Sequence, residues 1–163
     1  MQLNRLTDYA VIVLSYLART PRTDGGDNLA GDFVLASSAQ IAEETAIPSP
    51  TVAKLLKMLS KSDLVTSQRG IAGGYFLSRK PTEISVAEII RAVEGPIALT
   101  ACVDGNEGDC SSESFCAMRG NWDQVNRAVT DALERVSLVE MRPMFPNLSA
   151  SLGQLPQTSE TIS

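Results

Sequence analysis

The sequence predicts a mainly α-helical fold in which two short helices and a β-hairpin precede a long C-terminal helix. Three observations predict this class. Apolar residues recur at spacings of three and four over residues 3–18, 50–62 and 118–136, which is typical of amphipathic helices. Capping-box patterns open two more helical segments. A glycine-rich turn at residues 69–74 separates two strand-like runs, as expected of a hairpin.

The first helix is expected over residues 3–18, where Asp8 lies near the start and off the apolar stripe. The helix dipole favours a carboxylate at such a position. Residues 20–32 are rich in Gly, Asp, Pro and Asn, which predicts a surface loop, and residues 33–35 are expected to form a short strand. The apolar stripe of the helix consists of Leu3, Leu6, Ala10, Val13, Leu14 and Leu17.

Two short helices follow. Ser37 and Gln40 form a capping box that opens a helix ending near Thr45. Pro48 ends this helix, and Ser49 is expected to cap the next one, with Pro50 at its first position. At about 100° per residue, this second helix has a basic face and an apolar face. The basic face carries Pro50, Lys54, Lys57 and Lys61, and the apolar face carries Val52, Leu55, Leu56 and Leu59.

Two short helices joined by a tight turn, the second with a basic outer face, indicate a helix-turn-helix. An ordinary solvated stripe is the alternative for the lysines. The hairpin expected from residues 64–68 and 75–78 follows directly, which predicts the wing of a winged helix. Arg69 at its tip is expected to enter a DNA minor groove. Gly73-Gly74 would let the backbone approach phosphates and would also serve the geometry of the hairpin.

The distribution of charge supports a nucleic-acid partner for this region. The net charge of the chain is −5, which by itself argues against such a partner. Residues 50–81, however, carry six basic residues and one acidic residue, a net charge of +5. Residues 1–49 carry three basic and six acidic residues, and residues 82–163 carry five and twelve. A phosphate backbone would be attracted to the central segment and repelled elsewhere.

Two helices are expected after the hairpin. Ser85 and Glu88 form a capping box, and Gly95-Pro96 ends the helix that it opens. A long helix is expected from Met118 to Val136, and Ser137 with Glu140 is expected to cap one further turn. The narrow apolar stripe of the long helix suits a coiled-coil-like dimer seam, with packing on its own domain as the alternative. This stripe consists of Trp122, Val125, Val129, Leu133 and Val136.

All three cysteines lie in one polar segment. Cys102, Cys110 and Cys116 are separated by seven and five residues, mainly Gly, Asp, Ser and Glu. Such a segment has too few apolar side chains to be fixed by a core, whereas three thiolates on one metal centre would fix it. A disulfide would leave one thiol over. The chain has no histidine, so a carboxylate, a backbone group or a small molecule must complete a metal site.

The absence of histidine also argues against an enzyme, because histidine is the commonest general base. The sequence has neither a signal-peptide pattern nor an apolar run long enough to span a bilayer. A cytoplasmic location is therefore expected. In that compartment clustered cysteines more often bind metal or sense redox state than form disulfides.

These motifs resemble those of the Rrf2 family of bacterial winged-helix regulators, which has IscR-like and NsrR-like members. The resemblance extends from Leu3 to about Met141. It is carried by residues 6–10, 50–56, 69–70 and 73–75 and by the three cysteines. The runs at residues 94–102, 119–122 and 136–138 are most similar to the branch that regulates the SUF iron–sulfur assembly operon.

The resemblance implies a homodimer that binds double-stranded promoter DNA and carries a 2Fe–2S or 4Fe–4S cluster held by Cys102, Cys110 and Cys116. It implies a transcriptional regulator that responds to the state of the cluster. Repression of SUF-type genes is expected, with activation as the alternative. IscR-like members place a histidine three residues after the last cysteine, where this chain has Arg119, a poor ligand for iron. NsrR-like members use an aspartate in the first helix of the partner subunit, and Asp8 occupies the matching position.

Several alternatives remain open at this point. Glu107, Asp109 and Glu113 compete with Asp8 as the fourth ligand. A thiol redox switch, a Zn²⁺-dependent regulator and a nitric-oxide-sensing repressor of the same family would keep the fold, and so would an adaptor that binds a protein through the basic helix.

The resulting domain assignment has three parts. Residues 1–81 form a DNA-binding domain, residues 82–141 form the cluster loop and dimerisation helices, and residues 142–163 form a disordered tail. The expected DNA contacts are Pro50, Thr51, Lys54, Lys57, Lys61, Arg69, Gly70 and Gly73.

Overall fold

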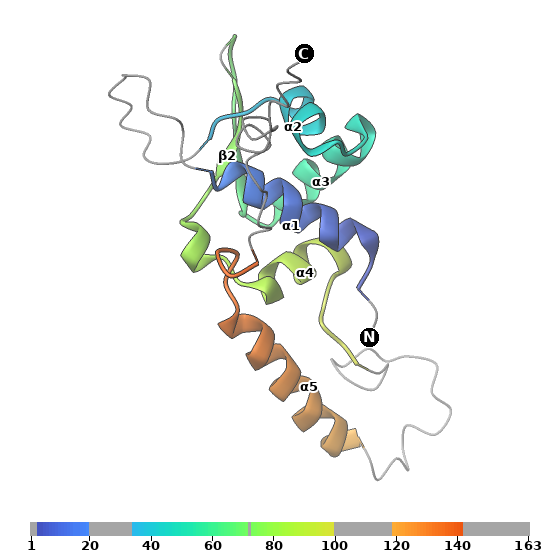
Figure 1. Cartoon of the computed structure of the whole chain (residues 1–163). Helices are drawn as coiled ribbons and strands as arrows, with labels where there is room; N and C mark the ends of the chain where they lie inside the picture. The colour runs from blue at the N-terminus through green and yellow to red at the C-terminus, as the bar shows by residue number, and fades with distance from the viewer. Residues whose placement is uncertain (1–2, 20–33, 72, 100–118, 142–163) are drawn as a thin grey trace, which may run out of the picture.

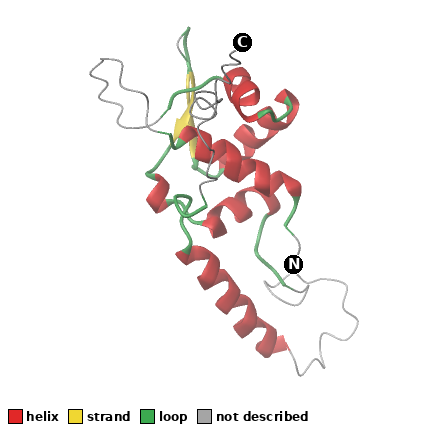
Figure 2. Ribbon diagram, in the orientation of Figure 1, coloured by secondary structure: helices red, strands yellow, loops and turns green. Residues whose placement is uncertain are grey.

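The computed structural model describes residues 3–19, 34–71, 73–99 and 119–141. Within these ranges the chain is mainly helical and contains one two-stranded antiparallel hairpin (Figure 2), which confirms the fold class. The elements are α1 (Arg5–Leu17), α2 (Ser38–Thr45), α3 (Ser49–Lys61), β1 (Val65–Gln68), β2 (Gly74–Leu77), a short 3-10 helix (Pro81–Glu83), α4 (Val86–Glu94) and α5 (Arg119–Arg135).

Helices α1 to α4 and the hairpin form a head, and α5 leads away from it (Figure 1). The head is held together by apolar stripes on α1, α3 and α4 that meet in one core. The inward face predicted for α3 is confirmed, because all four of its named apolar residues are buried. Helix α4 likewise buries Val86, Ile89, Ile90 and Val93. The stripe of α1 is confirmed from Leu6 onward, but Leu3 lies before the helix and is exposed.

Both predicted capping boxes are present. The Ser37 backbone N–H donates to the Gln40 side chain at 2.9 Å, and the Gln40 backbone N–H donates to the Ser37 hydroxyl at 3.3 Å. The same reciprocal pair joins Ser85 and Glu88. Each box satisfies backbone N–H groups that the first turn of a helix leaves without a partner.

The predicted cap at Ser49 is wrong by one residue. Pro48 is the N-cap of α3, and Ser49 is already helical. The reason is that the Pro48 carbonyl accepts the first helical hydrogen bonds, from the N–H groups of Thr51 at 2.8 Å and Val52 at 3.1 Å. No side chain caps this helix start.

The short strand predicted at residues 33–35 is also not found where the structure describes this stretch. Val34 and Leu35 are not in a strand, and Phe33 lies outside the described residues. Among described residues 34–36, pairing with β2 is confined to one bridge between Ala36 and Tyr75. The backbone groups of these two residues exchange hydrogen bonds of 3.1 and 2.8 Å. After Ala36, Ser37 begins the capping box of α2, and before it the Val34 N–H donates to the Leu17 carbonyl at 3.3 Å and not to β2.

The C-terminal end of α5 is tied to the head. The Val86 N–H donates to the Val136 carbonyl at 2.9 Å, and the Leu138 N–H donates to the Ile84 carbonyl at 2.8 Å. Ser137 and Glu140 pair as predicted, with the Ser137 N–H donating to Glu140 Oε2 at 2.7 Å, but they close a turn and not a helix. No helix in the described ranges is long and apolar enough to cross a membrane.

Candidate nucleic-acid interface and metal-binding segment

Helices α2 and α3 form a helix-turn-helix with a three-residue turn. Ala46 ends α2 in the left-handed conformation, with φ of 55°, which reverses the chain at once. Ile47 is buried in the core of the head, so the turn is fixed by an apolar contact. The geometry therefore holds α3 rigidly against α2, with one face left outward.

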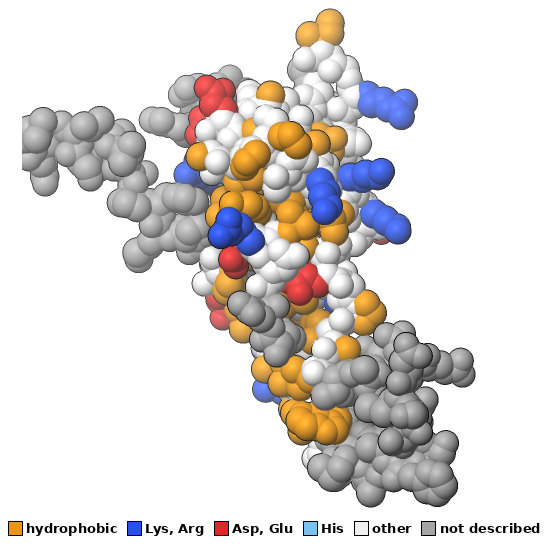
Figure 3. Space-filling view, turned by 90° about the vertical axis from the view of Figure 1, so that its right-hand side faces the viewer, with side chains coloured by type: hydrophobic (Ala, Val, Ile, Leu, Met, Phe, Trp, Pro, Cys, Tyr) orange, Lys and Arg blue, Asp and Glu red, His pale blue; other side chains and the backbone are white. Residues whose placement is uncertain are grey.

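The outward face of α3 is basic, as the sequence predicts. Lys54, Lys57 and Lys61 are all exposed. The salt bridges found in the described parts of the chain are Arg79–Glu88 and Arg91–Glu134, so none of the three ammonium groups is neutralised by a carboxylate there. Figure 3 shows Lys and Arg side chains standing out along one side of the head. Pro50 is exposed at the helix start, and Thr51 is half-buried.

The hairpin stands beside this helix as a wing. Its strands pair in register from Val65 with Leu77 to Gln68 with Gly74, and the Gly73 N–H donates to the Gly70 carbonyl at 3.0 Å to close the tip. Arg69 and Gly70 are exposed at this tip.

The tip also presents Ile71, which is fully exposed and which the sequence reasoning did not single out. The sequence does not mark this position, because the exposure of Ile71 becomes evident only in the folded hairpin. An apolar side chain there adds area to whatever surface the wing meets.

Two glycines of the wing are required by packing. A Cβ on Gly73 would lie 2.5 Å from the Gln68 carbonyl oxygen, and a Cβ on Gly74 would lie 2.7 Å from the Ala36 backbone. Gly70 has φ of 123°, a conformation that residues with side chains rarely adopt. Hairpin geometry therefore accounts for all three glycines, and an approach to phosphates remains a prediction.

The predicted metal ligands are only partly visible. Cys102, Cys110 and Cys116 lie outside the described residues, as do the competing carboxylates Glu107, Asp109 and Glu113. Asp8 lies in the first turn of α1 and is exposed. In the ranges that the structure describes, no group of three or more cysteine or acidic side chains is placed to hold a metal ion.

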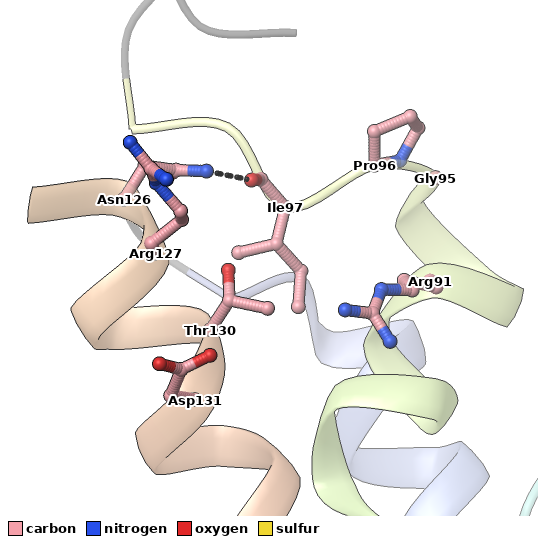
Figure 4. Close-up of a pocket in the computed structure, with 8 residues that line it drawn as sticks. All are labelled: Arg91, Gly95, Pro96, Ile97, Asn126, Arg127, Thr130 and Asp131. Atoms are coloured by element: carbon pink, nitrogen blue, oxygen red, sulfur yellow. Dashed lines mark hydrogen bonds between the residues drawn. The ribbon is translucent and has the colours of Figure 1, made fainter. Parts of the chain in front are cut away.

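The described chain that leads to the cysteines is held by Asn126, a residue that the sequence reasoning missed. Its side chain donates to the Ile97 carbonyl at 2.9 Å (Figure 4) and accepts from the Leu99 N–H at 3.0 Å. Asn126 lies four residues after Trp122 and three before Val129, so it is a polar residue within the apolar stripe of α5. That position is the signal that could have revealed it.

A groove of about 690 Å³ lies between the end of α4 and α5 (Figure 4). It is bordered by the Arg91 guanidinium, which is paired with Glu134 at 2.6 Å, and by Thr130 and Asp131 on α5.

The stripe of α5 is divided between two environments. Leu133 and Val136 pack on Val86, Ala87, Ile90 and Ile97 of the same chain. Trp122 and Val125, nearer the start of the helix, are 40% and 45% exposed. The described structure therefore supports own-domain packing for the C-terminal half of α5 and leaves Trp122 and Val125 exposed near its start.

A helix-turn-helix with a basic outer helix, followed at once by a hairpin, defines the winged-helix class of DNA-binding proteins. Residues 3–142 match the family model of Rrf2, described as an iron-dependent transcriptional regulator. The chain belongs to the Rrf2 family. Relatives in this family are named as transcriptional regulators and not as enzymes.

Two curated relatives illustrate the match. IscR of Photorhabdus laumondii is 36% identical over 103 residues, which is 63% of this chain and 62% of the relative. NsrR of Shouchella clausii is 26% identical over 141 residues, which is 86% of this chain and 88% of the relative. The chain thus spans less than two thirds of the IscR sequence but most of the NsrR sequence.

A solved structure supports the same fold. CymR, the global cysteine regulator of B. subtilis, superposes with a TM-score of 0.60 at 25% identity. The match covers 87% of this chain and 96% of that one.

Proposed function

We propose that this protein is a homodimeric transcriptional regulator whose grip on promoter DNA depends on an iron–sulfur cluster. The observation that carries the proposal is the position of the cysteines. All three lie between α4, which closes the head, and α5, which leads away from it. A group bound there would link the part that reads DNA to the part that pairs two chains.

The head supplies the DNA-binding surface. The proposed contacts are the exposed lysines of α3, together with Pro50 and Thr51 at its start and Arg69, Gly70 and Gly73 of the wing. Three ammonium groups in a row that no described carboxylate neutralises suit a line of phosphates, and their contribution is mainly electrostatic. Arg69 at the wing tip suits a narrow minor groove.

The uncovered half of α5 suits a second copy of the chain. Trp122 and Val125 present exposed apolar area near the start of α5, away from the part of the helix that packs on α4. Large aromatic side chains are typical anchors of such interfaces. Two copies joined through this helix would present two α3 helices, as the half-sites of a palindromic operator require.

The donor set fits an iron–sulfur cluster. Thiolates are the ligands that select iron–sulfur clusters, and Cys102, Cys110 and Cys116 supply three. The Asp8 carboxylate makes no hydrogen bond or ion pair with the other described residues, so it is available as the fourth ligand. When bound, the cluster would supply a centre whose metal–ligand bonds respond to redox state and to iron supply. The hard carboxylate oxygen would be its weakest ligand.

The chain's own residues would convert that state into DNA affinity. Asp8 belongs to the head, and the cysteines precede α5, so a shared group fixes the head of one subunit relative to the paired helices. Half-sites on B-DNA are about 34–36 Å apart. A small change in the placement of the two heads therefore changes the affinity strongly. The SUF-like runs around Gly95 and Trp122 support iron–sulfur assembly genes as the target.

The experiment is purification without oxygen, followed by visible absorbance and by iron and sulfide analysis. Wild-type protein is expected to be coloured and to contain iron and acid-labile sulfide. Cys110→Ser is expected to be colourless, and Asp8→Asn is expected to lose its colour faster in air. Iron-free protein that contains zinc, or that contains no metal and switches by thiol oxidation, would refute the cluster. Zinc binding and thiol oxidation are the main alternatives, because the chain is similar to CymR, which is named as a cysteine regulator.

A further inference from the structure

We propose that Asn126 is a positioning residue for the metal-binding segment. Its side chain holds the backbone of residues 97–99 on α5, so that the chain approaches Cys102 from a fixed point. This inference rests on the proposed function, because it assigns a role toward the cluster that the cysteines would hold.

The bonds of Asn126 are made in a nearly dry environment. Asn126 is 6% exposed, and its two hydrogen bonds go to backbone groups on either side of Ala98. A buried carboxamide without partners would cost stability, but here its oxygen and its nitrogen each have one. The side chain thus acts as a two-point clamp on a segment that has no regular secondary structure.

The clamp belongs to a rigid junction. Ile97 is buried against Val86, Ala87 and Ile90, with Leu133 of α5 packed on the same cluster. Three residues before Ile97, Glu94 binds the start of α1 through the Asn4 N–H at 2.8 Å and the Thr7 hydroxyl. Residues 94–99 are therefore fixed to α1 at one end and to α5 at the other.

The junction constrains the metal site because it ends only three residues before Cys102 in the sequence. Leu99 is three residues before Cys102, and three residues can span at most about 11 Å. Whatever fixes Leu99 on α5 therefore limits where Cys102 can present its thiolate. Groups that orient metal ligands without touching the metal typically change metal affinity 10–100-fold when they are replaced.

A role in apolar packing alone would not require asparagine at this position. The neighbouring positions of the stripe are Trp122, Val129 and Leu133, and leucine at residue 126 would extend it. An apolar side chain there would add burial but would leave the Ile97 carbonyl and the Leu99 N–H without their partner. Asparagine therefore fixes the path of the backbone at residues 97–99, whereas leucine would only bury more apolar area.

The test compares Asn126→Leu with Thr130→Val. Leucine removes both hydrogen bonds, whereas Thr130 lies one turn further along α5, lines the same groove and makes no hydrogen bond to residues 97–99 in the described structure. Asn126→Ser, an uncharged and smaller side chain whose single hydroxyl cannot bond both backbone groups, is the second variant in case the leucine variant does not fold. The readouts are the hydrogen-exchange rate of the Leu99 amide in metal-free protein and the rate of cluster loss in air, with urea unfolding as the control for global stability.

We expect Asn126→Leu to speed exchange at Leu99 by about tenfold or more and to shorten the lifetime of the cluster by at least about tenfold. Asn126→Ser should lie between wild type and Asn126→Leu, and Thr130→Val should match wild type. A folded Asn126 variant with fast exchange at Leu99 but the cluster lifetime of wild type would overturn the inference. Wild-type protein without iron would instead refute the proposed function, and the inference would fall with it.

Discussion

Glu94 and Thr7 join the end of α4 to the start of α1. The Glu94 carboxylate accepts a hydrogen bond from the Thr7 hydroxyl and another from the Asn4 backbone N–H. A carboxylate is disfavoured at the C-terminal end of its own helix but favoured at the N-terminal end of the next one. The contact therefore fixes the first turn of α1, which carries Asp8, on the residue that precedes the Gly95-Pro96 turn.

Replacement of Glu94 by alanine tests this contact. Thr7 is buried, so Glu94→Ala leaves a buried hydroxyl without its acceptor and is expected to lower the free energy of unfolding by about 1–3 kcal/mol. Urea unfolding measures the change, and Glu43→Ala, an exposed glutamate of α2, is the control. Equal unfolding midpoints for wild type and Glu94→Ala would show that the contact contributes nothing.

The lysines of α3 should set the salt dependence of DNA binding. Lys57→Ala removes one phosphate partner, so the slope of log affinity against log salt should decrease by about 1. The probe is the duplex that wild-type protein enriches from a random DNA pool, titrated at several salt concentrations. Arg135→Ala, which removes an exposed charge at the end of α5, should keep the wild-type slope. A slope unchanged in Lys57→Ala would remove α3 from the interface.

Gly74 should tolerate no side chain. A Cβ there would meet the Ala36 backbone at 2.7 Å, and neither backbone can move without breaking the bridge between Ala36 and Tyr75. Gly74→Ala is expected to lower the free energy of unfolding by about 1–3 kcal/mol, as overpacking does. Ser67→Ala, on the exposed part of β1, is the matched control. Thermal unfolding of the two variants gives the comparison, and a Gly74→Ala protein as stable as the control would contradict the packing argument.

Glu88 should make stability depend on acidic pH. Burial alone would raise the pKa of Glu88, but the hydrogen bonds from Ser85 and the Arg79 guanidinium outweigh it and lower the pKa below 4.5. A carboxyl with a lowered folded-state pKa contributes stability above its unfolded value, and this stability is lost as the pH falls through the folded value. The difference in unfolding free energy between wild type and Glu88→Gln should therefore be constant near neutral pH and shrink below about pH 4.5. A difference that does not change with pH would show that the charge of Glu88 is not involved.

Local patterns were sufficient to predict most of the head. The capping boxes at Ser37 and Ser85 and the two faces of α3 depend on residues three or four positions apart, so the sequence contains the whole interaction. The predicted N-cap at Ser49 is off by one residue, because Pro48 and Ser49 can both occupy the N-cap position at this helix start. The strand predicted at residues 33–35 failed because its length depends on a distant partner, Tyr75.

The features that escaped the sequence reasoning are long-range contacts. Asn126 binds residues 27 and 29 positions away, and Glu94 binds residues 87 and 90 positions away. Neither residue belongs to a local motif, and each gains its role only when α4 and α5 or α4 and α1 meet. Asn126 did leave one sign, since a polar residue interrupts an otherwise apolar stripe.

The most direct test of the account is a titration of the selected DNA duplex with cluster-loaded and cluster-free protein, both without oxygen and at one salt concentration. The proposed cluster would couple the head to α5, so cluster-free protein is expected to bind at least about tenfold more weakly, within the usual range of allosteric coupling. Equal affinities of the two forms would contradict it, because the cysteine segment would then have no influence on the DNA-binding surface.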